Sequence, residues 1–388
     1  MHIAVKRKGC NYMDNLYWVG IRESEVQYTN FINNSITIFG NNNISMQNKL
    51  KKIIDHNNTK NFDLIDNFFN KEAKEIIKKN PKVRFMYYSQ INSYDSIKKF
   101  DLLDYVICLN NQELVEYLSD KFKLKDYFKE FIPILDYELV KGINCTVEKI
   151  QNKFNTNIDE FIIQSATGSG GSGTMVLSNK SENKLEINKE QIYMVTKYCK
   201  NNIPINMHVL ISDNEIQMLP PSIQIIQVGD NKLLYKGCDY IAYKKEFPHE
   251  LNEKFKRYCK IVAKKLQDMG YRGVLGIDSI AYEGEIYLME INTRFQNSST
   301  ILNRALLENN LPSIQELHYN CFYNRKISIK DFDVNYSCYI KENGIDNKTI
   351  DIKSIDELDK INNNIEKETL CYLGTSVYNN SIYKKVKT

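Results

Sequence analysis

The chain has 388 residues, which at roughly 100–200 residues per domain indicates two or three packed units. Hydrophobic residues make up 42% and charged residues 26%, so the chain can bury sizeable cores and disorder along its whole length is excluded. Its 52 Lys and Arg against 48 Asp and Glu leave a net charge of +4, too weak a balance to indicate binding to nucleic acid or to a membrane surface.

Nine cysteines are scattered along the chain without a C-x-x-C pair, which predicts reduced core thiols in a cytoplasmic protein. The basic segment 1–8 is not followed by an apolar region with a cleavage site. No window reaches the roughly 18 apolar residues that would span a bilayer. We therefore expect neither a secreted protein held by disulfides nor a membrane-spanning one.

The first hundred residues alternate short apolar runs with helical patterns. Strands are expected at 3–6, 35–39, 83–88 and 105–109, and helices at 46–54 and 71–79. Strands that alternate with helices predict an open sheet of the βαβ type. A further helix is expected at 111–131, ended near Pro133.

The pattern changes at residue 161. Strands are expected at 161–164, 174–177, 191–199, 205–211, 274–280 and 285–291, and helices at 251–269, 298–309 and 313–322. One face of the helix 251–269 is apolar, and it consists of Leu251, Phe255, Cys259, Val262 and Leu266. Gly270 is placed to end that helix, and Glu283-Gly284 to form the turn of a hairpin.

A glycine-rich loop, Gly168-Ser169-Gly170-Gly171-Ser172-Gly173, lies between the strands 161–164 and 174–177. Glycines let backbone N–H groups turn toward an anion and approach it closely. A dinucleotide site is excluded because a strand follows instead of a helix, and a P-loop because no Gly-Lys-Ser/Thr is present. A protein kinase is excluded because its downstream motifs are missing. A flap over a nucleoside triphosphate and a flexible surface loop remain.

The second candidate site is the hairpin 274–291. Glu290, Asn292 and Arg294 share one face because strand residues two apart point the same way. Asp278 pairs with Glu290 if the turn is a three-residue loop with a bulge, whereas a two-residue loop would break that pairing.

Carboxylates opposite one another repel, and Mg²⁺ removes this penalty. The guanidinium of Arg294 suits an acyl phosphate or a developing oxyanion. A solvated hairpin end and a glycosidase-like acid/base pair are the alternatives.

Together and in this order, these features resemble the ATP-grasp superfamily, specifically its carboxylate–amine ligases of the biotin-carboxylase-like branch. The resemblance covers about residues 104–309. It rests on the glycine flap and on Ser119-Asp120-Lys121, Lys197-Tyr198, Asp278 and Glu290-Ile291-Asn292-Thr293-Arg294. It implies an α/β (α+β) fold with three parts. These are an N-terminal open α/β pre-ATP domain at 1–110, linker helices and a small lid at 111–204 with the flap at 165–174, and a C-terminal antiparallel-sheet domain with the metal site at 205–388.

The resemblance also implies ATP and two magnesium ions, with Asp278, Glu290 and Asn292 as metal ligands. Arg294 and Lys121 are the implied catalytic residues. The implied nucleotide-binding residues are Lys121, Gln164, Ser169, Gly170, Gly171, Ser172, Gly173, Lys197, Tyr198, Cys199 and Ile280. Ile280 would pack on the base and 197–199 would form the adenine hinge. The sequence departs from the family twice, with Gln164 in place of a lysine and Thr196 in place of an acid. Taken without the family, Lys121 is typical of a solvated helix lysine and Tyr198 of a core aromatic.

The implied reaction begins when a carboxylate attacks the γ-phosphate, which gives an acyl phosphate and ADP. An amine then displaces phosphate, with no nucleophilic side chain required. The implied partners are a small carboxylic acid, such as an amino acid, and an amine, with no nucleic acid and no membrane; a homodimer is one assembly that the family allows. Two other functions stay open: a non-catalytic ATP-binding partner protein, motivated by Gln164, and an ATP-grasp phosphotransferase.

Overall fold

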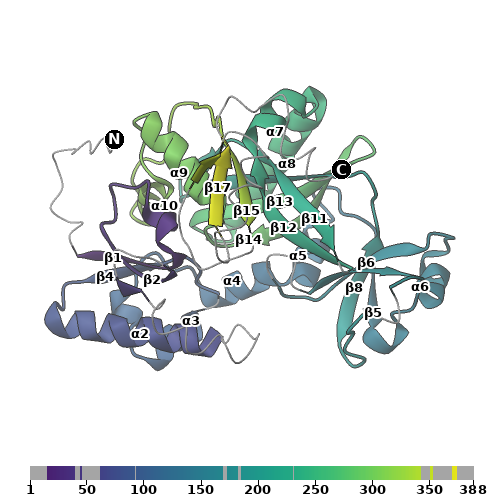
Figure 1. The fold of residues 1–388 in the computed structure, drawn as a ribbon, viewed down its shortest axis with the longest axis horizontal. Helices are drawn as coiled ribbons and strands as arrows, with labels where there is room; N and C mark the ends of the chain where they lie inside the picture. The colour runs from purple at the N-terminus through teal and green to yellow at the C-terminus, as the bar shows by residue number, and fades with distance from the viewer. Residues whose placement is uncertain are drawn as a thin grey trace.

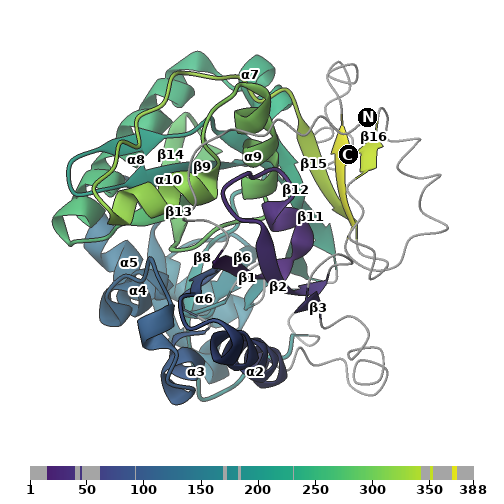
Figure 2. The same ribbon diagram turned by 90° about the vertical axis from the view of Figure 1, so that its left-hand side faces the viewer.

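The computed structural model describes residues 15–39, 44–45, 62–91, 93–168, 173–181, 185–229, 231–341, 350–352 and 369–373. The expected strand 3–6 and the expected helix 46–54 lie outside the described residues. Figures 1 and 2 show the fold from two directions at right angles.

The N-terminal part is a parallel four-stranded sheet with helices on one side (Figure 1). Its strands, in spatial order, are β3 (Ile44–Ser45), β2 (Asn34–Phe39), β1 (Leu16–Arg22) and β4 (Arg84–Tyr87). The helices are α2 (Phe62–Lys79) and α3 (Tyr94–Lys99). The expected open sheet is confirmed, as are its strands 35–39 and 83–88 and its helix 71–79.

Two features of this sheet were not predicted correctly. The central strand β1 was missed because both of its faces are covered, so that Trp18 and Val19 are both buried and no alternation is visible. The expected strand 105–109 is wrong. A 3-10 turn, η2 (Leu103–Tyr105), is followed by a single bridge to the sheet at Val106, and Cys108 has a φ of 61°, which no extended strand adopts.

The single helix expected at 111–131 is two helices, α4 (Gln112–Ser119) and α5 (Lys121–Phe128). Asp120 between them is extended, and its side chain accepts hydrogen bonds from the backbone N–H groups of Phe122 and Lys123. Aspartate competes for local backbone donors in this way and favours the N-cap over a helix interior. The break makes Lys121 the first residue of α5.

All the remaining described strands belong to one 13-stranded, mostly antiparallel sheet. One end of it forms a lobe at the right of Figure 1, which we call the lid. The lid contains β5 (Tyr137–Lys141), η3 (Gly142–Asn144), α6 (Val147–Phe154), β6 (Glu160–Gln164), β7 (Thr174–Ser178) and β8 (Ile192–Lys197). Strand β6 lies between β7 and β8, so the expected strands at 161–164, 174–177 and 191–199 are confirmed.

The other end of the sheet carries the hairpin of the candidate site. Its strands are β9 (Ile203–Ile211), β10 (Ile216–Met218), β11 (Ser222–Gly229), β12 (Lys232–Asp239), β13 (Gly273–Tyr282) and β14 (Glu285–Asn292). Strand β15 (Ser337–Lys341) pairs with β12, β17 (Thr369–Leu373) pairs with β15, and β16 (Ile350–Ile352) pairs with β17; β15 and β16 are labelled at the right of Figure 2. The helices are α7 (Tyr240–Glu246), α8 (His249–Asp268), α9 (Ser299–Glu308) and α10 (Ile314–Phe322), and the 3-10 turn η1 (Glu23–Val26) precedes β2. The expected strands and helices of this region are confirmed.

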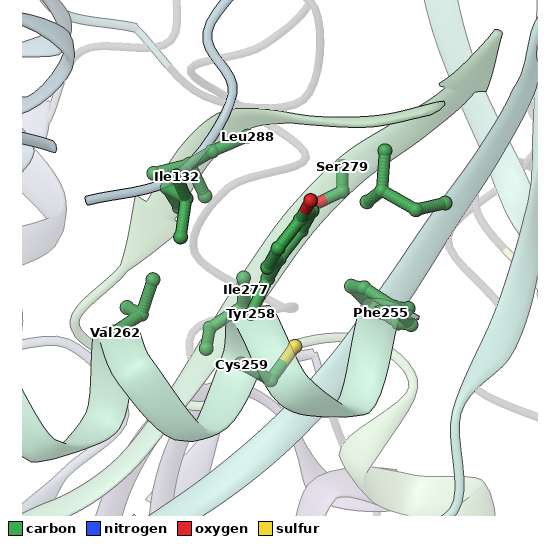
Figure 3. A pocket seen from close by; sticks show the side chains of 9 residues that line it. Ile132, Phe255, Tyr258, Cys259, Val262, Ile277, Ser279 and Leu288 are labelled. Atoms are coloured by element: carbon green, nitrogen blue, oxygen red, sulfur yellow. The ribbon is translucent and has the colours of Figure 1, made fainter. Parts of the chain in front are cut away.

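Helix α8 supports the hairpin from behind. Its predicted apolar face is buried at Phe255, Cys259, Val262 and Leu266 and partly buried at Leu251, and it packs in one core with β9, β13 and β14. Gly270 has a φ of 85° and follows the end of the helix, as expected. Figure 3 shows a gap in this core between α8 and the hairpin, with a volume of about 10 Å³. Such a gap is about the size of one water molecule, so it is no ligand site.

Seven cysteines in the described part of the chain have free thiols, and six of these are buried. This agrees with the expectation of reduced core thiols. Among the described helices, none combines the length and the apolarity that crossing a bilayer would require.

Candidate functional site

The hairpin β13–β14 places Asp278 opposite Glu290, as the sequence predicted, but by a different route. The turn has two residues, Glu283 and Gly284, with φ values of 48° and 78°. The expected three-residue loop is therefore wrong. Pairing shifts by one residue between Asp278 and Ser279, so that Met289 is an extra residue in β14. This β-bulge, away from the turn, restores the register that brings the carboxylates together.

Asn292 bridges the two carboxylates. Its Nδ2 donates to Asp278 Oδ2 at 2.9 Å and to Glu290 Oε1 at 3.2 Å, while its Oδ1 accepts from Arg294 Nη2 at 2.8 Å. Asn206 on β9 donates to the other oxygen of Asp278. The carboxamide of Asn292 therefore presents N–H groups to the acids, and it would have to rotate to offer its oxygen to a metal ion.

The pKa values of the two acids are shifted in opposite directions. Burial, together with the charge of Glu290, raises the pKa of Asp278 to about 7. Burial also acts to raise the pKa of Glu290, but the charges of Lys121 and Arg294 outweigh it and lower that pKa. Because the two carboxylates lie so close together, ionisation of both is unfavourable. A divalent cation would relieve the repulsion between them.

These side chains fit a magnesium site that shares its ligands with a substrate. Among the described residues, no third Asp, Glu, His or Cys joins Asp278 and Glu290. Mg²⁺ is commonly held by one or two carboxylates, with phosphate oxygens and water filling its other positions. The donor set thus suits the metal of a metal–nucleotide complex better than an isolated structural ion.

Lys121 connects the hairpin to the start of the glycine loop. Its buried Nζ lies 3.0 Å from the carbonyl oxygen of Gly168 and 3.2 Å from Glu290 Oε2. The alternative of a solvated helix lysine is therefore wrong. Ser169, Gly170, Gly171 and Ser172 lie outside the described residues.

The glycine loop joins two strands that pair closely at its base. Ser165 N donates to the carbonyl oxygen of Gly173 at 2.9 Å, and β6 pairs with β7 along its length. Gly173 has a φ of 77°, and a Cβ there would lie 2.1 Å from Ser165 Oγ, so this end of the loop requires glycine. The expected arrangement of strand, glycine loop and strand is confirmed.

A cleft of about 260 Å³ between the lid and the hairpin brings most predicted site residues together. The predicted residues that line it are Gln164, Lys197, Tyr198, Cys199, Asp278, Ile280, Glu290, Asn292 and Arg294. The lining combines apolar side chains, Ile162, Ile226, Leu233, Ile280 and Met289, with the two acids and Arg294. A ligand that has both a flat apolar group and a polyanion with a metal ion would fit such a lining.

Residues 118–298 match the family model of the ATP-grasp domain. The chain contains an ATP-grasp domain. The matched segment runs from α4 to the residue before α9, so it holds the lid, the cleft and the hairpin. The predicted resemblance to the ATP-grasp superfamily is confirmed.

A curated relative, the [butirosin acyl-carrier protein]–L-glutamate ligase of Niallia circulans, is 24% identical over 180 residues. The aligned part is 43% of this chain and 41% of the relative, so the chain matches less than half of that protein.

Solved structures share the fold over most of the chain. The carboxyaminoimidazole ribonucleotide synthase of Aspergillus clavatus, in complex with ATP, has a TM-score of 0.58 at 13% identity, with 96% of this chain and 97% of that chain covered. The biotin carboxylase domain of the Hydrogenobacter thermophilus 2-oxoglutarate carboxylase has a TM-score of 0.58 at 15% identity, with 84% and 74% covered. The Thermotoga maritima phosphoribosylamine–glycine ligase has a TM-score of 0.55 at 14% identity, with 84% and 80% covered. The expected α/β (α+β) ATP-grasp fold is confirmed.

The ATP-grasp domain also contains site residues that the sequence prediction missed. Gln224 and Tyr235 line the cleft from β11 and β12, which were not predicted as strands. Lys125 lies fully buried one helical turn after Lys121. Burial, and secondarily the charge of Lys121, lower the pKa of Lys125 to about 8. The spacing of four residues between the lysines was a visible signal that both share one face of α5.

Proposed function

We propose that this protein is an ATP- and Mg²⁺-dependent carboxylate–amine ligase. It would activate a small carboxylic acid as an acyl phosphate and join it to an amine, with release of ADP and phosphate. The observation that carries the proposal is the position of Lys121, whose ammonium contacts both Glu290 and the backbone at the base of the glycine loop. Lys121 thus links Glu290, which lines the cleft, to the base of the glycine loop.

We assign the site residues as follows. Asp278 and Glu290 would hold magnesium, joined by Asn292 once its carboxamide has rotated. The metal would supply charge neutralisation at the phosphate oxygens. Lys121 would bind the phosphates together with the N–H groups of 169–173, and Arg294 would orient the reacting acid. Residues 197–199 and Ile280 would hold the adenine, and Gln164, which also lines the cleft, would contact the phosphates.

The reaction needs no nucleophilic side chain. A carboxylate oxygen of the acid forms a bond to the γ-phosphorus while the bond from that phosphorus to the ADP oxygen breaks. The amine nitrogen then bonds to the acyl carbon, the bond from that carbon to the phosphate oxygen breaks, and the nitrogen releases a proton. Catalysis would come from positioning and from charge stabilisation by Lys121 and Arg294.

An amino acid is the proposed acid substrate. The name of the Niallia circulans relative contains L-glutamate and an acyl-carrier protein. We therefore include glutamate among the acids, and amines borne by an acyl-carrier protein among the acceptors. We also propose a cytoplasmic location and the division into parts at 1–110, 111–204 and 205–388.

The test measures ADP release over pairs of amino acids and amines with Mg·ATP. We expect ADP release to require both an acid and an amine. We also expect it to fall at least about a hundredfold in Glu290→Ala and in Arg294→Ala. Full turnover in both variants would remove the assignment.

A non-catalytic ATP-binding role is the second candidate, because Gln164 stands where the family has a lysine. Tight binding of Mg·ATP in calorimetry, without ADP from any pair, would favour it. ADP formed with a stable phosphorylated acid and no need for an amine would instead indicate a phosphotransferase.

A further inference from the structure

Helix α5 carries two buried lysines that have different surroundings. The charge of Lys121 is met by Glu290 at 3.2 Å. Lys125 is more deeply buried, with no exposed surface, and in the described part of the chain it forms no ion pair. Its Nζ donates one hydrogen bond, 3.5 Å long, to Gln164 Oε1. The charge of Glu290 also acts on Lys125, but from beyond ion-pair distance. An ammonium buried with only this and one long hydrogen bond is costly, so it suggests that a further counter-charge arrives from outside the protein.

The contact with Lys125 fixes which way the carboxamide of Gln164 points. An ammonium group is a donor only, so it must face the amide oxygen. The amide nitrogen then faces the other way and donates to Thr174 Oγ1 at 3.3 Å. Nε2 carries a second N–H, for which the described residues provide no further acceptor. Because Gln164 lines the cleft, the group it offers to a ligand is a donor and not an acceptor.

The position of this donor suits an anion. Gln164 is the last residue of β6, directly before the glycine loop, and Asp278 and Glu290 line the same cleft. A positive charge behind an amide polarises it and strengthens the hydrogen bond that its N–H groups make. A buried ammonium and an outward N–H together provide both the charge and the contact that a phosphate group requires.

We propose that Lys125 and Gln164 form one two-residue phosphate-binding element of this chain. Gln164 contacts the phosphate, and Lys125 is a positioning residue that orients the carboxamide and supplies the charge. The proposal rests on the proposed nucleotide-dependent function. It accounts for a glutamine at the end of β6, because the missing cation is supplied from α5.

Binding of Mg·ADP and of adenosine to the full chain tests the proposal. Lys125→Met keeps the volume and apolar stem while it removes the charge and the donor. We expect its affinity for Mg·ADP to fall about tenfold, while its affinity for adenosine changes less than about twofold. The matched control is Lys123→Met, on the exposed face of the same helix, which should leave both affinities unchanged. Gln164→Met should reproduce the selective loss, and adding Gln164→Lys to Lys125→Met should restore affinity for Mg·ADP.

A Lys125→Met variant that binds Mg·ADP as tightly as the unaltered chain would overturn the proposal and leave the nucleotide site standing. An equal loss for Mg·ADP and adenosine would also overturn it, because a purely structural role has that effect. If the unaltered chain bound neither ligand, the proposed function would fall as well. Should Lys125→Met not fold, Gln164→Met decides in the same way, because it removes the contact and leaves the lysine in place.

Discussion

Asp278 and Glu290 lie directly opposite each other on β13 and β14, and the single side-chain nitrogen of Asn292 donates to both carboxylates. The arrangement is electrostatically unfavourable, because two partly buried acids share one amide group as their bridge. Without a bound cation, the repulsion between the two acids lowers the stability of the folded protein. A bound cation offsets that repulsion, so the arrangement is typical of a functional site. The following predictions rest on this relationship and on the groups around it.

Removing one charge from the acid pair should stabilise the ligand-free protein and abolish its response to ligand. In Asp278→Asn, relief of about 1 kcal/mol of repulsion should raise the melting temperature by about 2–4 °C. Adding Mg·ADP should not raise the melting temperature of this variant. Thermal melts with and without Mg·ADP measure both effects, and a variant that keeps the full ligand-induced shift would contradict a role for Asp278 in binding the metal.

Loss of Lys121 should weaken nucleotide binding, because its Nζ contacts both Glu290 and the carbonyl oxygen of Gly168. We expect Lys121→Met to lower the affinity for Mg·ADP at least about tenfold, the size typical of a charge-assisted hydrogen bond. Calorimetry at one ionic strength measures the affinity of each variant for Mg·ADP. Lys129→Met is the matched control, since Lys129 pairs with Asp126 on the exposed side, and equal affinities in the two variants would count against the assignment.

Gly276 is required by the packing of Gln296. A Cβ at this position would lie 2.2 Å from the Gln296 carboxamide, which accepts a hydrogen bond from Asn206 at 3.1 Å. Gly276→Ala should therefore lower the free energy of unfolding by about 1–3 kcal/mol. Gly229→Ala is the control, because no atom lies within 4 Å of a Cβ there. Urea unfolding compares them, and equal stability of both variants would refute the prediction.

Acid should destabilise the protein through His208, whose Nε2 lies 3.0 Å from Ser299 Oγ. The side chain is fully buried, and burial, followed by the charge of Arg294, lowers its pKa to about 3 from 6.5. Between these values the unfolded chain binds a proton that the folded chain does not, so stability is present above pH 6.5 and is lost as the pH falls toward 3. His318, with its pKa also lowered to about 3 by burial, acts in the same direction.

His208→Gln should lessen this acid sensitivity by removing one of the two groups. Urea unfolding at pH 7.5 and pH 5 gives the loss of stability for each protein. The difference between the two pH values should be smaller in His208→Gln than in the unaltered chain, and an equal or larger difference would contradict the prediction.

Much of the fold follows from local sequence signals. The apolar spacing in 251–269 predicted α8, and Gly270 predicted its end, because both depend on residues within one or two turns of each other. The hairpin with Asp278 and Glu290 was also visible, since alternation along two neighbouring strands and a Gly turn are short-range features. In contrast, β1 was invisible because it is covered on both faces, and its burial depends on α2 and on distant helices.

By itself, the sequence determined the type of chemistry: a glycine loop between strands and a pair of acids on a hairpin, each encoded within a few consecutive residues. Tertiary structure alone decided how these parts meet. The bulge at Met289 sets the register of the acids, the break at Asp120 aims Lys121 at the loop base, and the packing of α5 under β6 joins Lys125 to Gln164. Such contacts join residues tens of positions apart, and their geometry depends on the balance of packing, desolvation and hydrogen bonding over the whole fold, which no local pattern contains.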